Sequence, residues 1–187
     1  MEIKNISVLG GAEWKEDDEV YQECFKTCRL LAENGFTILN GGGPGVMRAA
    51  TEGTHAGGGK AIGVTFYPKY PHAHFEGRDM KNLIDEEIIT QDYFSRTKEL
   101  LVRGHCHLVF KGGTGTISEF GMSWASARIH EGHSIPLILF GHFWHDIIGA
   151  FKGHMYMRPD EFKLYSIVET PEEVLDFVRS LKERSPS

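Results

Sequence analysis

The sequence predicts an α/β protein whose doubly wound, mostly parallel sheet carries helices on both faces. Short apolar runs alternate with segments of helical periodicity along the whole chain. Glycine clusters follow apolar runs and precede helical segments, most clearly at Gly41–Gly45 and Gly112–Gly115. No internal repeat and no linker-like composition divides the chain, so we expect one domain over residues 1–187.

The N-terminal half alternates between expected strands and helices. The first helix is expected to be capped by Asp17 or Asp18, and Asn34-Gly35 ends it. A second helix is expected from about Val46 to the glycines at 57–59. The expected strands are Ile3–Leu9, Phe36–Leu39, Lys60–Phe66 and Ile84–Thr90.

The C-terminal half continues the same alternation. Before it, Tyr67–Lys81 has two prolines, two histidines and little periodicity, and we expect a surface excursion over a ligand site. Thr170-Pro171 is expected to begin the last helix, and Lys182–Ser187 to be a frayed tail. The other expected elements are a helix from Asp92 to Arg103, strand His107–Phe110, a helix to about Ile129, strand Ile135–Phe140, helix Trp144–Phe151 and strand Tyr165–Val168.

Composition excludes several classes of protein. Hydrophobic residues make up 41% and charged residues 25%, which is typical of globular domains. A net charge of −6 argues against broad nucleic-acid binding. Cys24, Cys28 and Cys106 form no CxxC motif, so free buried thiols in a reducing compartment are expected. Without a signal-peptide pattern or an apolar run near the roughly 18 residues of a membrane span, we expect a cytoplasmic protein with no membrane contact.

The glycine loop at 112–115 favours an anionic ligand. An apolar strand runs into this loop, and helical sequence continues beyond it. Glycine lets backbone N–H groups approach a ligand, and the following helix presents unpaired N–H groups and the positive end of its dipole. A phosphate is the expected occupant. The predicted binding residues here are Gly112, Gly113, Thr114, Gly115 and Thr116.

The same stretch has a purely structural interpretation. Thr116-Ile117-Ser118-Glu119 fits a capping box, in which Glu119 only satisfies a backbone donor. The glycine spacing fits neither the dinucleotide fingerprint, because Val46 and Ser118 stand where its third glycine belongs, nor the Walker motif. A mononucleotide or another phosphate ester therefore fits better than NAD or ATP with magnesium.

Several motifs together resemble the LONELY GUY (LOG) family of cytokinin riboside 5′-monophosphate phosphoribohydrolases, often mislabelled lysine decarboxylases. The family signature P-G-G-x-G-T-x-x-E is similar to Lys111–Glu119, with lysine in place of proline. Its early glycine loop resembles Gly41–Met47, and its Arg-Lys pair resembles Arg96-Thr97-Lys98 with one residue inserted. The resemblance spans roughly Ile6–Leu139.

The resemblance implies a Rossmann-like, usually dimeric fold that hydrolyses the N-glycosidic bond of a nucleoside 5′-monophosphate. The resemblance implies that this reaction needs no cofactor. It also implies that Arg96 and Glu119 are the catalytic pair. Further ligand-binding residues that it implies are Gly42, Gly43, Gly45, Met47 and Lys98. The signature helix carries more apolar surface than one sheet contact needs, from Phe120, Met122, Trp124 and Ile129. Phe120 and Trp124 are expected in the core or in a dimer interface rather than against a base.

This assignment makes chemical sense. Breaking a glycosidic bond develops positive charge on the sugar, which a nearby carboxylate such as Glu119 stabilises. Arg96 would hold Glu119 ionised or bind the phosphate, and the alternative for Arg96 is a solvated charge on a helix. Met47 would touch the base or fill the core.

Ten histidines invite a metal interpretation. His105 and His107 are spaced to share a face of a strand, as are His72 and His74 if extended, and His142 and His145 lie three apart. No HExxH motif or Cys/His cluster with ligand spacing is present, so no metal site is expected.

Two functions therefore remain open from the sequence. The first is nucleotide hydrolysis on a nucleoside monophosphate. The second is non-catalytic binding or carriage of a phosphorylated ligand such as a nucleotide or the molybdenum cofactor, a role proposed for some family members. Arg96 and Glu119 favour the first, while Lys111 and the inserted Thr97 leave room for the second.

Overall fold

Seven strands form one parallel sheet in the computed structural model, which describes residues 3–69, 77–130 and 135–183. Every neighbouring pair is parallel, and the order across the sheet is 4-3-2-1-5-6-7 in chain numbering. The predicted doubly wound α/β class is confirmed. The strands are β1 (Asn5–Leu9), β2 (Thr37–Asn40), β3 (Ala61–Phe66), β4 (Glu86–Thr90), β5 (Cys106–Val109), β6 (Leu137–Phe140) and β7 (Tyr165–Val168).

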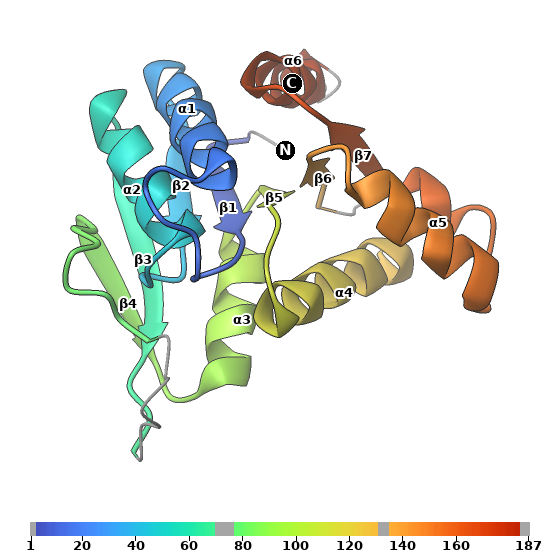
Figure 1. Ribbon diagram of the computed structural model, residues 1–187, viewed down its shortest axis with the longest axis horizontal. Coiled ribbons are helices and arrows are strands. Elements are labelled where there is room, and N and C mark those ends of the chain that lie inside the picture. Colours follow the sequence, from blue (N-terminus) through green and yellow to red (C-terminus); the bar gives the residue numbers. More distant parts are fainter. Residues whose placement is uncertain (1–2, 70–76, 131–134, 184–187) are drawn as a thin grey trace.

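Helices cover both faces of the sheet (Figure 1). The bounds are α1 (Glu19–Glu33), α2 (Val46–Ala56), α3 (Tyr93–Arg103), α4 (Thr114–Ile129), α5 (Trp144–His154) and α6 (Pro171–Glu183). Side chains of α1, α2 and α6 pack in one buried cluster, and those of α3, α4 and α5 pack in a second. The sheet therefore lies between two layers of three described helices each.

Strand β5 shows how a short central strand supports both layers. Cys106 and Leu108 are buried in the cluster with α1, α2 and α6, whereas Val109 is buried with α3, α4 and α5. Period-two alternation produces this division, because successive side chains leave opposite faces of a strand. Fully burying one such aliphatic side chain stabilises the fold by roughly 1.5–3 kcal/mol.

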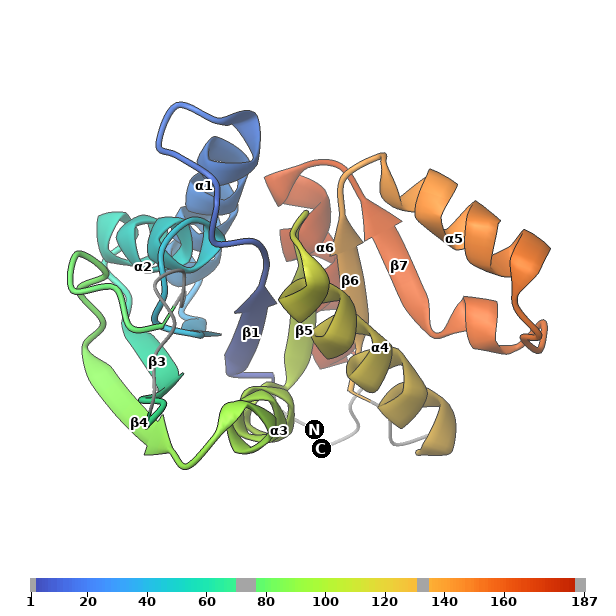
Figure 2. The ribbon, with the colours of Figure 1, turned by 60° about the horizontal axis from the view of Figure 1, so that its bottom comes forward.

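The position of β1 and β5 determines where a ligand can enter. The chain builds β1 to β4 outward on one side and then adds β5, β6 and β7 on the other side of β1. The loops that follow β1 and β5 therefore diverge, which leaves a crevice at the carboxyl ends of these strands. Figure 2 shows the loop after β1 and the start of α4 at this same edge.

The predicted element bounds hold with small shifts. Strand β1 begins at Asn5 rather than Ile3, and β4 at Glu86 rather than Ile84. Asp18 precedes α1, but its carboxylate accepts from the Lys15 N–H (2.7 Å) and makes no side-chain cap. His72 and His74 of the predicted excursion and the end of the predicted tail lie outside the described residues.

The three cysteines are buried free thiols, as expected. Cys24 and Cys28 lie in α1, with their sulfur atoms 4.0 Å apart, and Cys106 lies in β5. Burial raises the pKa of Cys106 to about 12, which suppresses the reactive thiolate. Among the described residues, no helix combines the length and apolar character that crossing a bilayer requires.

Candidate functional site

A cavity of about 820 Å³ opens at the point where the strand order reverses. Its volume lies within the range typical of small-molecule sites. Three parts of the chain supply most of its wall: the loop Gly10–Trp14 after β1, the side of α3, and the loop and first turns of α4. Open α/β sheets typically bind their ligands in a crevice at this position.

The α4 end of the cavity has the features of an anion site. Helix α4 begins at Thr114, with Gly113 as the N-cap residue and no side-chain cap. The first N–H groups of a helix have no acceptor within it. A Cβ on Gly113 would meet no atom within 4 Å, and one on Gly115 would meet only the Tyr93 hydroxyl at 3.7 Å. Both glycines line the cavity, so their missing side chains leave its space to a ligand.

The capping-box interpretation of this stretch is wrong. Thr116 lies inside α4 rather than at its N-cap, and it is buried. The Glu119 carboxylate accepts from Arg96 Nη1 at 3.2 Å. The side chain of Glu119 therefore belongs to the cavity, where it lies in the second turn of α4.

Arg96 is held in place by three different elements. Its Nε donates to the Val64 carbonyl of β3 at 3.1 Å, and its Nη2 lies 3.5 Å from the Met47 sulfur of α2. With Nη1 on Glu119, the whole guanidinium is engaged, and only 12% of the side chain is exposed. The interpretation of Arg96 as a solvated helix charge is therefore wrong.

Gly41 is needed because of Arg96. A Cβ at this position would overlap the guanidinium of Arg96 and crowd the Met47 sulfur. Only glycine leaves the space that Arg96 occupies.

Glu119 is a buried carboxyl group beside a fixed cation. Its residue is 5% exposed, and burial raises the pKa of its carboxyl above the ordinary value. The charge and hydrogen bond of Arg96 act in the opposite direction and offset part of this rise in the pKa. The pair thus places a carboxyl group of tuned acidity at the inner wall of the cavity.

The glycine loop at 41–45 lies mostly outside the cavity wall. Gly41 and Met47 line the cavity, whereas Gly42, Gly43 and Gly45 are not among its lining residues. The Gly42 carbonyl accepts from the Asp79 N–H at 2.9 Å, and the Gly43 carbonyl accepts from the Asn82 side chain at 2.8 Å. Asp79, in the described end of the predicted excursion, and Asn82, just after it, therefore cover this loop.

Gly45 serves a different purpose. It has a φ of +63°, and a Cβ there would overlap the backbone of Gly11 and Ala12. The next residue, Val46, donates its N–H to the Gly11 carbonyl at 2.9 Å. Glycine thus lets α2 begin directly against the loop that follows β1.

Lys98 and Lys111 lie outside the cavity wall. Lys98 is exposed on α3. The Lys111 carbonyl accepts from the Gly11 N–H at 3.1 Å and from the Trp14 indole at 2.9 Å, joining the two loops. Any residue supplies such a carbonyl, so the replacement of the signature proline by Lys111 preserves this link.

Three aromatic residues of the wall were not predicted from the sequence. Trp14, Phe66 and Tyr93 line the cavity from the loop after β1, the end of β3 and the start of α3. The Tyr93 hydroxyl lies 2.5 Å from the Ser118 hydroxyl of α4. Of the three, Trp14 could have been predicted from the sequence, because it comes shortly after Gly10-Gly11, a glycine pair that follows a strand.

These features define a Rossmann-like α/β protein with a glycine-lined cavity where the strand order reverses. The chain belongs to the SLOG cluster4 family, whose model matches residues 3–135. The resemblance to LOG proteins that the motifs indicated is confirmed at the level of the family.

Two relatives align with most of the chain. An uncharacterized protein of Archaeoglobus fulgidus is 27% identical over 142 residues, which cover 75% of this chain and 87% of the relative. A probable cytokinin riboside 5′-monophosphate phosphoribohydrolase of Oryza sativa subsp. japonica, LOGL2, is 24% identical over 168 residues. That match covers 84% of this chain but 63% of the rice protein.

Solved structures share the fold over nearly the whole chain. The molybdenum cofactor binding protein of Rippkaea orientalis has a TM-score of 0.72 at 20% identity, covering 97% of this chain and 98% of that one. The molybdenum cofactor carrier protein of Chlamydomonas reinhardtii has a TM-score of 0.67 at 18% identity, covering 98% of this chain and 100% of that one. At these identities the likeness concerns the fold.

Proposed function

We propose that the chain hydrolyses the N-glycosidic bond of a nucleoside 5′-monophosphate and releases the free base and ribose 5-phosphate. The buried pair of Arg96 and Glu119 carries this proposal, because it lies in the same cavity as the glycine-lined start of α4. The rice relative, named as a probable phosphoribohydrolase, supports the same reaction.

In this proposal the 5′-phosphate binds at the start of α4. The N–H groups of Thr114, Gly115 and Thr116 and the positive end of the helix dipole would face it. Charge-assisted hydrogen bonds of this kind contribute roughly 1.5–3 kcal/mol each. Phosphate binding fixes the sugar at a set distance from Glu119, one turn further along the same helix.

Glu119 would act on the ribose. As the bond from C1′ to the base breaks, its electron pair leaves with the base, and positive charge spreads over C1′ and the ring oxygen. Water then adds to C1′ and gives up a proton, and the departing base takes up a proton. The carboxylate of Glu119 stabilises that charge more strongly in a buried site than it would in bulk water. Arg96 favours the ionised form of Glu119 and orients its carboxylate through the 3.2 Å contact.

The aromatic wall suits the base. Trp14, Phe66 and Tyr93 give the cavity an apolar side on which a planar ring can pack. The apolar residues Val8, Leu9 and Leu100 extend this surface. This division into a polar phosphate end and an apolar base end matches the two halves of a nucleotide.

The second candidate is a carrier of a phosphorylated ligand. Its support is that proteins named for binding or carrying the molybdenum cofactor align with this chain from end to end. A carrier needs the anion site but does not need a charged Glu119. The two functions therefore predict different effects of removing the charge of Glu119.

The decisive experiment is Glu119→Gln, assayed by release of base from a panel of nucleoside monophosphates. Glutamine keeps the size of the side chain but removes the charge. We expect turnover to fall by roughly 10²–10³, as when one electrostatic contact is removed from a preorganised site. Affinity for the monophosphates should hold or rise, since the phosphate then has no nearby carboxylate.

The matched control is Glu172→Gln, which removes an exposed carboxylate at the start of α6. It should change neither turnover nor affinity for the monophosphates. Undiminished hydrolysis in Glu119→Gln would exclude its catalytic role. Tight binding by the parent protein without hydrolysis of any monophosphate would favour the carrier.

A further inference from the structure

A group of three metal-ligating side chains lies outside the cavity described above. It consists of His142, His145 and Glu169, whose donor atoms all lie within 4.8 Å of one another. None of the three lines the cavity. His142 lies in the turn after β6, His145 in the first turn of α5, and Glu169 directly after β7.

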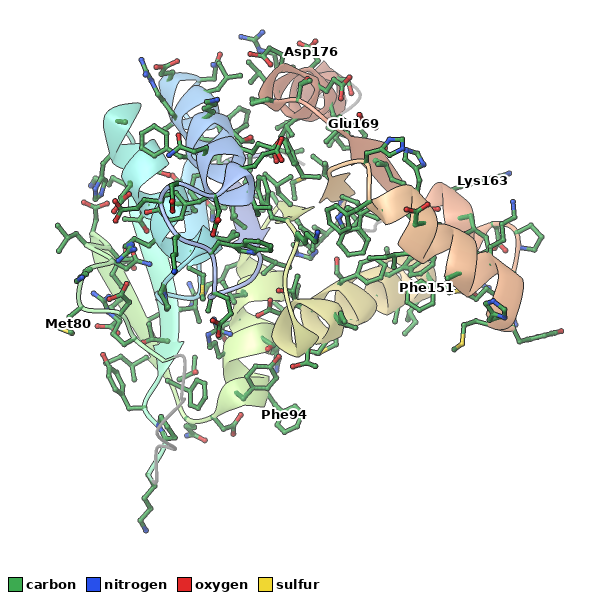
Figure 3. The ribbon with its side chains drawn as sticks, in the orientation of Figure 1. Met80, Phe94, Phe151, Lys163, Glu169 and Asp176 are labelled. Atoms are coloured by element: carbon green, nitrogen blue, oxygen red, sulfur yellow. The ribbon has the colours of Figure 1, made fainter. Side chains whose placement is uncertain are left out.

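The backbone holds these three residues together. The Gly141 N–H donates to the Val168 carbonyl at 2.8 Å, so the residues that follow, His142 and Glu169, leave the sheet side by side. The His145 N–H donates to the His142 carbonyl at 3.0 Å, which sets both imidazoles in one turn. Figure 3 shows Glu169 at the end of β7, beside the start of α5.

The turn that carries both histidines depends on a glycine. Gly141 has a φ of +109°, a conformation that other residues rarely adopt. Its Cβ would also approach the Phe143 ring at 2.9 Å. Trp144, which follows, is buried in the core and anchors the start of α5. The donors are therefore presented by a fixed turn on a rigid sheet end.

The donor atoms lie close enough to converge on one metal ion. One oxygen of Glu169 lies 2.7 Å from Nδ1 of His142, and the two imidazole ring centroids are 5.1 Å apart. Ligands of a tetrahedral zinc ion lie about 3.3 Å apart, given bond lengths of 2.0–2.1 Å. Side-chain rotation supplies the small adjustment, since the side chains of His142 and Glu169 are 79% and 50% exposed.

We propose that His142, His145 and Glu169 form a binding site for a divalent transition-metal ion, with zinc as the best match to the donors. Two imidazoles and one carboxylate suit zinc, whereas magnesium and calcium prefer oxygen ligands alone. Three protein donors leave the fourth position to water or to an exchangeable ligand, as in zinc sites that are not purely structural. The carboxylate of Glu169 and that of Asp146 in the first turn of α5 offset the positive helix end.

The same geometry without a metal would be an ion pair on the surface, which contributes little to stability. The two interpretations differ in their response to zinc. The test is a calorimetric titration of untagged, metal-stripped full-length protein with zinc chloride. We expect one high-affinity site per chain, and a cobalt-substituted protein with the visible absorption of four-coordinate cobalt.

His145→Ala and Glu169→Gln should each weaken zinc binding by more than about 100-fold, beyond the 10–100-fold typical of losing an outer-shell partner. The matched control is His154→Ala, which removes an exposed histidine from the other end of the same helix. It should leave both the affinity and the cobalt spectrum unchanged. These side chains are exposed, so circular dichroism should show each variant folded.

Zinc affinity that is equal in the parent protein, His145→Ala and Glu169→Gln would overturn the proposal, as would a parent protein that binds no zinc. The buried cysteines do not compete for the metal in the folded chain. The result is independent of the proposed hydrolysis, because Glu119→Gln leaves all three donors in place.

Discussion

At the scale of single residues, His107 shows how burial sets the chemistry of a side chain. It lies in β5 and is 2% exposed. One ring nitrogen, Nε2, is 2.9 Å from the Leu101 carbonyl, which accepts only, so the neutral ring donates there and accepts from the Ser123 hydroxyl at Nδ1. Burial lowers the pKa of His107 to about 4.

This pKa makes stability depend on pH in a defined direction. Below its ordinary pKa of 6.5 the unfolded chain binds a proton at His107, whereas the folded chain does not until about pH 4. The free energy of unfolding should therefore fall as the pH drops from 6.5, by about 2 kcal/mol at pH 5, at 1.36 kcal/mol per unit. Urea unfolding at pH 7 and pH 5 measures this loss.

The variant His107→Gln lacks the titrating group and should lose less stability between these pH values, by about the same 2 kcal/mol. His154→Gln, at an exposed position, should behave as the parent protein does. An equal pH dependence in His107→Gln and the parent protein would contradict the assignment of this effect to His107.

At the scale of elements, the start of α4 should accept a larger side chain without loss of the fold, but not without loss of ligand binding. A side chain on Gly115 enters space that only the Tyr93 hydroxyl approaches. Gly115→Val should therefore leave the fold intact but fill the proposed phosphate site and abolish AMP binding in a calorimetric titration. Gly149→Val, also facing open space but on α5, should bind AMP normally. Unchanged affinity in Gly115→Val would remove this loop from consideration.

The two glycine loops look alike in sequence but have different structural roles. The loop at 112–115 faces the cavity with Gly113 and Gly115. The loop at 41–45 instead makes room for Arg96 and for the loop after β1, while residues 79–82 cover its carbonyls. Sequence spacing identifies both as loops at strand ends, but only packing decides which one faces a ligand.

At the scale of the whole molecule, α3 and α4 each leave large apolar side chains exposed. Met122 and Ile129 of α4 are 43% and 75% exposed, and Phe94 of α3 is 76% exposed. Figure 3 shows Phe94 at the start of α3. Phe120 and Trp124, for which the sequence left the core and a dimer interface open, are buried in the core of the same chain. Any dimer contact on α4 must therefore use its other side.

We propose a two-fold dimer through the exposed side of α4 that carries Met122 and Ile129, since isologous dimers are the commonest assemblies. Light scattering at micromolar concentration should give twice the 21.0 kDa mass of the chain. Introducing charge with Met122→Glu and Ile129→Glu together should return the mass to that of a monomer. Met155→Glu, at an exposed apolar residue beyond α5, should remain dimeric. A parent protein with monomer mass would contradict the proposal.

The sequence by itself determined the order and type of the elements and therefore the fold class. Periodicity and glycine position are local properties, so strands such as His107–Phe110 and the loop that follows could be located without knowing their neighbours. Motif resemblance also placed Arg96 and Glu119 in one site, and the structure brings them within 3.2 Å.

Only the tertiary structure decided which residues share a surface. Trp14, Phe66 and Tyr93 come from three distant segments, and Glu169 reaches His142 and His145 only because β6 and β7 are neighbours. Burial decided the properties of three further side chains, because it fixes Arg96, raises the pKa of Glu119 and removes Phe120 from the surface. Burial and long-range contact depend on the whole packed sheet, and no local pattern in the chain encodes them.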